Sequence, residues 1–97
     1  MLHTVNKSPF SSKSFDMFLE FVVDSEPLLL YEDGVFAVQS GTKYESEILE
    51  LIKTNPVYVL QADLKARSIN NIITGVKVVN YEGFVDLVVE NKVQNWL

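Results

Sequence analysis

Few residues of this 97-residue chain could perform catalysis, and they do not combine into a catalytic set. Cysteine is absent, which excludes a thiolate nucleophile, a disulfide and cysteine-based metal sites. His3 is the only imidazole; it could act as the base for a serine or threonine nucleophile, but no nucleophile-elbow pattern accompanies it. A hydrogen-bonded structural histidine is therefore the favoured interpretation. We expect no catalytic residue, no metal site and no cofactor.

The stretch that is most informative about function is Asp33-Gly34, which follows three consecutive leucines at Leu28–Leu30. This short apolar run, bounded by Pro27 and Gly34, predicts a strand that is buried on both faces, as in a parallel sheet. Loops after the carboxyl ends of such strands are where open α/β sheets bind ligands and partners. A plain turn is the simpler alternative, because Asp and Gly are common turn residues. Asp33, Gly34 and Val35 are the candidate partner-binding residues of this loop.

Asp63 and Arg67 form the second candidate group. They lie four residues apart on a predicted helical piece, so they can form a local ion pair. An exposed pair of this kind contributes less than about 1 kcal/mol and would have no function of its own. The functional alternative places both side chains at the carboxyl edge of the sheet, in contact with a partner. By contrast, Glu45, Glu47 and Glu50 are typical of a solvated helix face rather than of a general acid and base pair.

Glycine spacing and charge exclude two further classes of function. The four glycines, Gly34, Gly41, Gly75 and Gly83, never approach the spacing of a dinucleotide or phosphate-binding loop. The formal net charge is -5 at pH 7 and the pI is about 4.7. Seven lysines and the single arginine are scattered without a basic run, which argues against direct binding of nucleic acid.

Alternating strand and helix patterns position the candidate residues. Apolar or alternating runs predict four strands, at 2–5, 28–30, 57–60 and 76–79. Helical spacing predicts a helix after Ser12 or Ser14 as N-cap, a second from Tyr44 to Lys53, a short piece at 63–67 and a last helix capped by Asn80. The apolar segment 35–38 is compatible with a short helix or with an irregular segment that covers the core, and the sequence does not decide between them.

Two of these helices are predicted to bury apolar stripes. The stripe of the first helix consists of Phe15, Phe18, Leu19, Val22 and Val23, and that of the last consists of Phe84, Leu87 and Val88. Trp96, near the end of the chain, is expected to pack against a neighbour in its own domain or in a partner.

The order of the elements predicts the fold class. Strands alternating with helices indicate a three-layer α/β domain with a mainly parallel sheet of four to five strands flanked by helices. A length of 97 residues predicts a single domain over 1–97. Hydrophobic residues make up 47% of the chain, so we expect exposed apolar surface and a homo- or hetero-oligomer. With neither a signal-peptide pattern nor an apolar run long enough to cross a bilayer, we expect a cytoplasmic protein without membrane contact.

Four separated stretches, each weak alone, together resemble one family. They are Met1-Leu2-His3-Thr4 with Ser8-Pro9, Leu28-Leu29-Leu30 followed by Asp33-Gly34-Val35, Asp63-Leu64 with Ala66-Arg67, and Tyr81 with Phe84-Val85 before Trp96. In this order and spacing they are similar to the TusB proteins, the DsrH-like subunits of the bacterial sulfur-relay complex, over essentially the whole chain. The family often has glycine after the Ala-Arg pair, where Ser68 stands here, which leaves the turn at that position open.

The resemblance implies a DsrE-type α/β fold and a non-catalytic subunit. TusB-like proteins assemble with the related TusC and TusD subunits as a dimer of heterotrimers. That complex takes persulfide sulfur from TusA and passes it to TusE, and the tRNA thiolase MnmA finally uses it to form 2-thiouridine at the wobble position of certain tRNAs. The sulfur-carrying cysteine belongs to TusD. The partners implied for this cysteine-free chain are therefore TusC-like and TusD-like subunits and, through the complex, a TusE-like acceptor.

Two other hypotheses are weighed beside this one. A stand-alone small-molecule-binding or regulatory α/β domain would use the Asp33-Gly34 and Asp63 loops. It predicts a stable free protein whose melting temperature rises with its ligand. An enzyme that uses His3 with a hydroxyl nucleophile is the third hypothesis, and full activity of a His3→Ala variant would exclude it.

Overall fold

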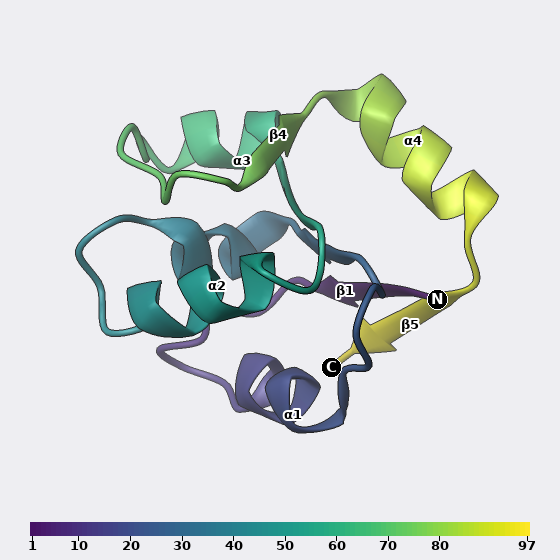
Figure 1. The fold of residues 1–97 in the computed structure, drawn as a ribbon. Coiled ribbons are helices and arrows are strands. Elements are labelled where there is room, and N and C mark those ends of the chain that lie inside the picture. The colour runs from purple at the N-terminus through teal and green to yellow at the C-terminus, as the bar shows by residue number, and fades with distance from the viewer.

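The computed structural model describes residues 1–97 and contains one five-stranded sheet in which every strand pair is parallel. Figure 1 shows the strands and the helices around them. The strand order across the sheet is β4-β3-β2-β1-β5. The strands are β1 (Leu2–Val5), β2 (Leu28–Leu30), β3 (Val57–Leu60), β4 (Lys77–Val79) and β5 (Val93–Trp96).

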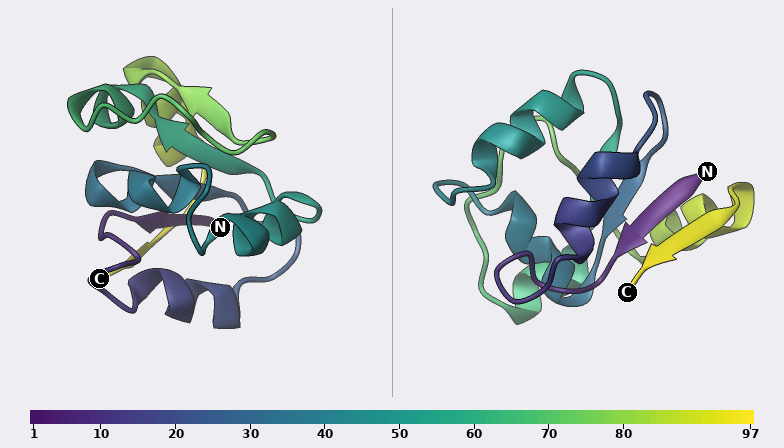
Figure 2. Two further views of the ribbon diagram at one scale, coloured as in Figure 1. Left: turned by 90° about the vertical axis from the view of Figure 1, so that its left-hand side faces the viewer. Right: turned by 90° about the horizontal axis from the view of Figure 1, so that it is seen from below.

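The helices cover the two faces of the sheet unequally. They are α1 (Ser14–Phe21), the 3-10 helix η1 (Glu32–Val38), α2 (Glu45–Ile52), α3 (Gln61–Ala66) and α4 (Tyr81–Glu90). From β1 to β4 each connection steps in the same direction, so right-handed crossovers place α1, η1, α2 and α3 on one face. The connection from β4 to β5 runs back across the sheet, which places α4 alone on the other face. In Figures 1 and 2, α4 lies well away from α1 and α2.

The main core lies between the sheet and the helices of the first face. Its members come from every strand that is central to the sheet and from the inner sides of α1, η1 and α2. The leucine strand is fully buried, as the run Leu28–Leu30 predicted, because it lies in the middle of the sheet with helices on both faces. The structure confirms the predicted three-layer α/β architecture.

The structure corrects two expectations about the ends of α1 and confirms one about the start of α4. α1 begins at Ser14 with Lys13 as N-cap; Ser12 Oγ instead accepts a hydrogen bond from the backbone N–H of Ser14 at 3.2 Å. α1 also ends at Phe21, where the backbone becomes extended, so Val23 leaves the predicted stripe and is 63% exposed. The predicted Asn80 cap is confirmed, since its Oδ1 accepts from the N–H of Gly83 at 2.9 Å.

The expected burial of Phe84, Leu87 and Val88 is wrong. No residue of α4 is buried: Phe84 and Leu87 are half-buried, and Val88 is exposed. The physical reason is that α4 has no neighbouring helix on its face, so only the side toward the sheet is covered. An apolar stripe with the correct spacing therefore remains partly open to solvent.

Candidate functional site

The structure brings Asp33, Asp63 and Arg67 together at the carboxyl edge of the sheet. Arg67 Nε donates a hydrogen bond to Asp33 Oδ1 at 2.8 Å, and Arg67 Nη1 donates to the backbone oxygen of Asp63 at 3.2 Å. Asp63 Oδ2 in turn accepts from the backbone N–H of Glu32 at 2.7 Å. Asp33 is 58% exposed in this arrangement. The two groups of residues that the sequence singled out thus form one polar cluster that ties η1 to α3.

Gly34 and Val35 lie beneath this cluster rather than at its surface. A Cβ atom added to Gly34 would lie 2.2 Å from the backbone oxygen of Val5, so η1 crosses the end of β1 at a distance that only glycine permits. Val35 is fully buried in the core. These two residues hold the loop in place; Asp33 is the exposed member of the set, and Asp63 and Arg67 are half-buried beside it.

A polar cleft of about 380 Å³ opens beside the Asp33–Arg67 pair. Its lining has no apolar side chain and combines two cations, two carboxylates and several hydroxyl or amide groups. The lining residues are Asn6, Lys7, Ser8, Ser11, Ser12, Glu32, Asp33 and Arg67. Sequence reasoning missed the contribution of residues 6–12. Their position directly after a predicted strand was the available signal, because all carboxyl ends of parallel strands meet at one edge. The cleft can form hydrogen bonds and ion pairs, but it contains no pair of nucleophile and base.

The side chain of Asn6 marks this cleft as a place for polar contacts. Asn6 Nδ2 donates to Glu32 Oε1 at 3.1 Å, whereas Asn6 Oδ1 is buried and has no hydrogen-bond partner in the chain. No group of three or more His, Cys, Asp and Glu side chains lies close enough together to hold a metal ion. No helix combines the length and the apolar character needed to cross a membrane.

Outside the cleft, the structure confirms that His3 is a hydrogen-bonded residue within the fold. His3 Nδ1 accepts a hydrogen bond from the indole Nε1–H of Trp96 at 3.0 Å. Because Nδ1 is the acceptor, the imidazole is the neutral tautomer that carries its proton on Nε2. That Nε2 lies 2.8 Å from Glu26 Oε1 and donates to it. Trp96 also stacks on Phe21, with ring centroids 6.1 Å apart. Both imidazole nitrogens are therefore occupied, and neither is paired with a hydroxyl nucleophile.

The pH dependence of folding should report the His3–Glu26 contact. The hydrogen bond from His3 is the main cause that holds the pKa of the Glu26 carboxyl below its usual value of 4.5, and the backbone N–H of Val23 adds to it. A carboxyl whose folded-state pKa is lowered contributes stability that is present above about pH 4.5 and is lost as the pH falls through the folded-state pKa. In urea unfolding, wild type should exceed Glu26→Gln in stability at pH 7, and the difference should shrink as the pH falls below about 4.5 and through the lowered pKa of Glu26. A difference that stays constant with pH would contradict this.

Ser68 keeps a turn conformation that glycine would take without strain. Its φ angle is 53°, in the left-handed region, directly after the C-cap residue Arg67 of α3. Helices often end with glycine in this conformation, and a side chain there costs about 1 kcal/mol. The left-handed turn is therefore kept, although Ser68 stands where the family often has glycine.

Comparisons with known proteins agree on one family. A family model described as DsrH like protein matches residues 7–94. Proteins named Protein TusB from Shigella flexneri and from a strain of Escherichia coli are each 35% identical over 97 residues, which covers 97% of this chain and 97% of theirs.

Solved structures show the same fold at lower sequence identity. The ychN protein of E. coli has a TM-score of 0.79 at 21% identity, and the alignment covers 97% of each chain. A protein of unknown function from Methanobacterium thermoautotrophicum has a TM-score of 0.72 at 14% identity, covering 97% of this chain and 96% of that one. These two likenesses concern the fold alone. The family match and the TusB relatives span nearly the whole sequence, and the chain therefore belongs to the DsrH-like family as a TusB-like member.

Proposed function

We propose that this chain is a non-catalytic subunit of a cytoplasmic sulfur-relay complex. In this proposal it assembles with TusC-like and TusD-like subunits as a dimer of heterotrimers. The complex passes persulfide sulfur toward a TusE-like acceptor and a tRNA thiolase, which forms 2-thiouridine at the wobble position. The observation that carries the proposal is the 35% identity to TusB proteins over 97% of both chains.

The absence of cysteine supports an architectural role. A persulfide carrier needs a thiolate, and this chain contains no cysteine at all. The polar cleft beside Asp33 also contains no nucleophile paired with a general base. Sulfur would therefore travel on another subunit, and the net charge of -5 fits a protein that leaves the binding of tRNA to the downstream enzyme.

The exposed face of α4 supports a protein partner. Tyr81 is 67% exposed, Val85 49% and Val89 76%, and all three lie on the only helix of that side of the sheet. Large exposed apolar patches usually mark protein–protein contacts. We assign this α4 face, made of Tyr81, Val85, Val88 and Val89, to the interface with the other relay subunits.

Co-expression tests the proposed assembly. The chain is produced with and without TusC-like and TusD-like subunits from the same genome, and native mass spectrometry measures the species formed. We expect one complex that contains all three chains, and loss of 2-thiouridine from tRNA when this chain is deleted from the cell. A monomer or homodimer that ignores both subunits, with normal 2-thiouridine after deletion, would contradict the proposal. Stabilisation by a metabolite would then favour a stand-alone ligand-binding domain.

Substitutions in the polar cluster should separate assembly from folding. Because Asp33 is 58% exposed and Arg67 keeps its contacts with Asp63, Asp33→Ala should change the free energy of unfolding by less than about 1 kcal/mol. If the cluster contacts a partner, the same variant, or Arg67→Ala, should weaken co-purification with the other subunits and lower 2-thiouridine formation. Normal assembly and thiolation of both variants would remove these residues from the interface but would leave the subunit role intact.

A further inference from the structure

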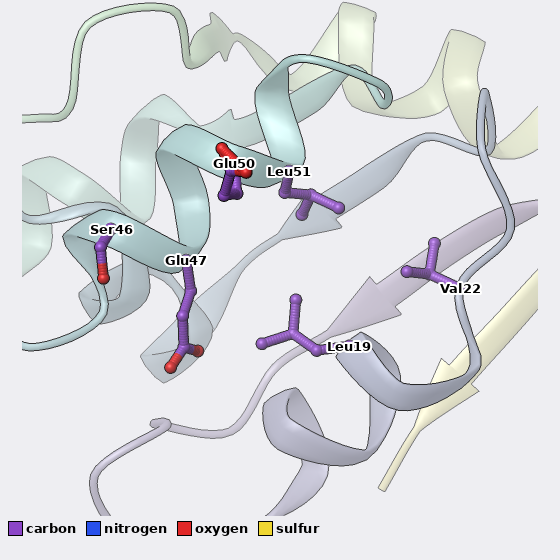
Figure 3. A pocket seen from close by; sticks show the side chains of 6 residues that line it. All are labelled: Leu19, Val22, Ser46, Glu47, Glu50 and Leu51. Carbon is purple, nitrogen blue, oxygen red and sulfur yellow. The ribbon is translucent and has the colours of Figure 1, made fainter.

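A shallow apolar groove lies between α1 and α2, on the face of the sheet opposite α4. Figure 3 shows Leu19 and Val22 on one side of it and the residues of α2 on the other. The groove has a volume of about 420 Å³ and is lined by Leu19, Val22, Ser46, Glu47, Glu50 and Leu51. Leu19 and Val22 are only partly buried and pack against the main core, so the floor of the groove is continuous with that core.

Two carboxylates, Glu47 and Glu50, line the α2 side of this apolar floor. The two helices that form the groove contain no lysine or arginine. They contain five acidic residues, Asp16, Glu20, Glu45, Glu47 and Glu50. Glu47 takes part in no salt bridge, and Glu50 pairs only with Lys53, at 2.6 Å and in an exposed position. An exposed pair of this type contributes less than about 1 kcal/mol, so a partner's cation can replace Lys53.

The charge selects among the possible occupants. A second copy of this chain carries the same net charge of -5, and nucleic acids and anionic membranes are negative as well, so all three would be repelled. A partner that brings apolar side chains flanked by lysine or arginine would cover the exposed surface of Leu19 and Val22, above the already buried Leu51, and pair with Glu47 and Glu50. Amphipathic helices commonly bind apolar grooves in this way, with anchors at i, i+3, i+4 and i+7.

We propose that the α1–α2 groove is a docking site for a basic amphipathic helical segment of a partner protein. The site is separate from the α4 face, because right-handed crossovers place α1 and α2 on one side of the sheet and α4 on the other. A subunit that uses α4 for assembly therefore keeps this groove free for a second, reversible contact. Since the attraction is between exposed charges, the contact weakens as the salt concentration rises.

Peptide titration tests the proposal on the full chain. The probe is a fluorescently labelled amphipathic peptide with leucines at i, i+3, i+4 and i+7 and lysines beside that stripe, and fluorescence anisotropy measures its dissociation constant. We expect saturable binding that is weakened at least about tenfold by the double charge reversal Glu47→Lys with Glu50→Lys. Amide chemical shifts should change around residues 19–22 and 46–51 and not on α4.

Matched controls separate the groove from general electrostatics. The same charge change on the opposite face, Glu82→Lys with Glu90→Lys, should alter the dissociation constant less than about twofold. A peptide with the same composition but no apolar stripe, and one with glutamates in place of the lysines, should bind at least about tenfold more weakly. Melting curves establish that both protein variants remain folded.

Several results would overturn the proposal. They are a dissociation constant above about 1 mM for the lysine peptide, equal losses in the groove variant and the α4 control, and equal binding of the scrambled peptide. Self-association of the chain that the peptide reverses would assign the groove to a second copy instead. The titration is repeated with the co-purified relay assembly; binding to the free chain alone would place the groove inside the subunit interface and contradict a separate docking site.

Discussion

Replacing Gly34 with alanine is expected to destabilise the fold by roughly 3 kcal/mol or more. The added Cβ would lie 2.2 Å from the backbone oxygen of Val5, far inside van der Waals contact, and 3.0 Å from the backbone carbon of the same residue. Neither side can move easily, because Val5 lies in the sheet next to β2 and Val35 anchors η1 in the core. Urea unfolding followed by circular dichroism measures the effect.

Gly41→Ala provides the matched control for this substitution. Gly41 has a φ of 85°, but a Cβ there would meet no atom within 4 Å, so the change costs only the left-handed conformation, about 1 kcal/mol. The unfolding midpoint should therefore fall much further for Gly34→Ala than for Gly41→Ala. Equal midpoints would mean that η1 can move away from β1, and the close crossing would then not be essential to the fold.

Introducing two carboxylates on the α4 face should abolish assembly while leaving the free chain folded. Val85 and Val89 are largely exposed, so Val85→Asp with Val89→Asp should change folding stability by less than about 1 kcal/mol. In an interface, each unpaired carboxylate would have to be buried at a cost of several kcal/mol. We therefore expect the double variant to be absent from complexes isolated with the TusC-like and TusD-like subunits, an at least hundredfold loss of affinity.

Two exposed apolar residues on the other face serve as the control. Met17→Asp with Leu49→Asp makes the same chemical change on α1 and α2. This variant should still co-purify with the other subunits, and native mass spectrometry compares the two. If the α4 variant assembles normally, or if both variants fail equally, the interface does not lie on α4.

The sequence predicted the elements whose signals are local. Leu28–Leu30 and the strand at 57–60 are short apolar runs between turn residues, and Asn80 is a cap that acts within its own first helical turn. The strand β5 was missed because Val93-Gln94-Asn95-Trp96 has no such pattern. It is extended because it pairs with β1, and its Asn95 Oδ1 accepts from Thr4 Oγ1 across 91 residues of sequence.

Contacts between residues far apart in the sequence were likewise missed at the candidate site. Asp63 and Arg67 could be paired from their spacing, but the hydrogen bond from Arg67 to Asp33 depends on the placement of η1 beside α3. The apolar spacing of α4 correctly indicated a helix. It did not reveal how many neighbours that helix would have, and the exposure of Val85 and Val89 follows from the single backward crossover between β4 and β5.

The anchoring of β5 has a consequence for aggregation. β5 pairs with β1 alone, and of its four side chains only that of Trp96 is partly buried. The indole, held by His3 and Phe21, is thus the main side-chain anchor of this strand. If β5 detached, β1 would become an open, uncharged edge of the sequence Leu-His-Thr-Val, the type of strand to which other extended chains readily add. The His3–Trp96 hydrogen bond thereby helps to keep the fully buried strand β1 out of the edge position.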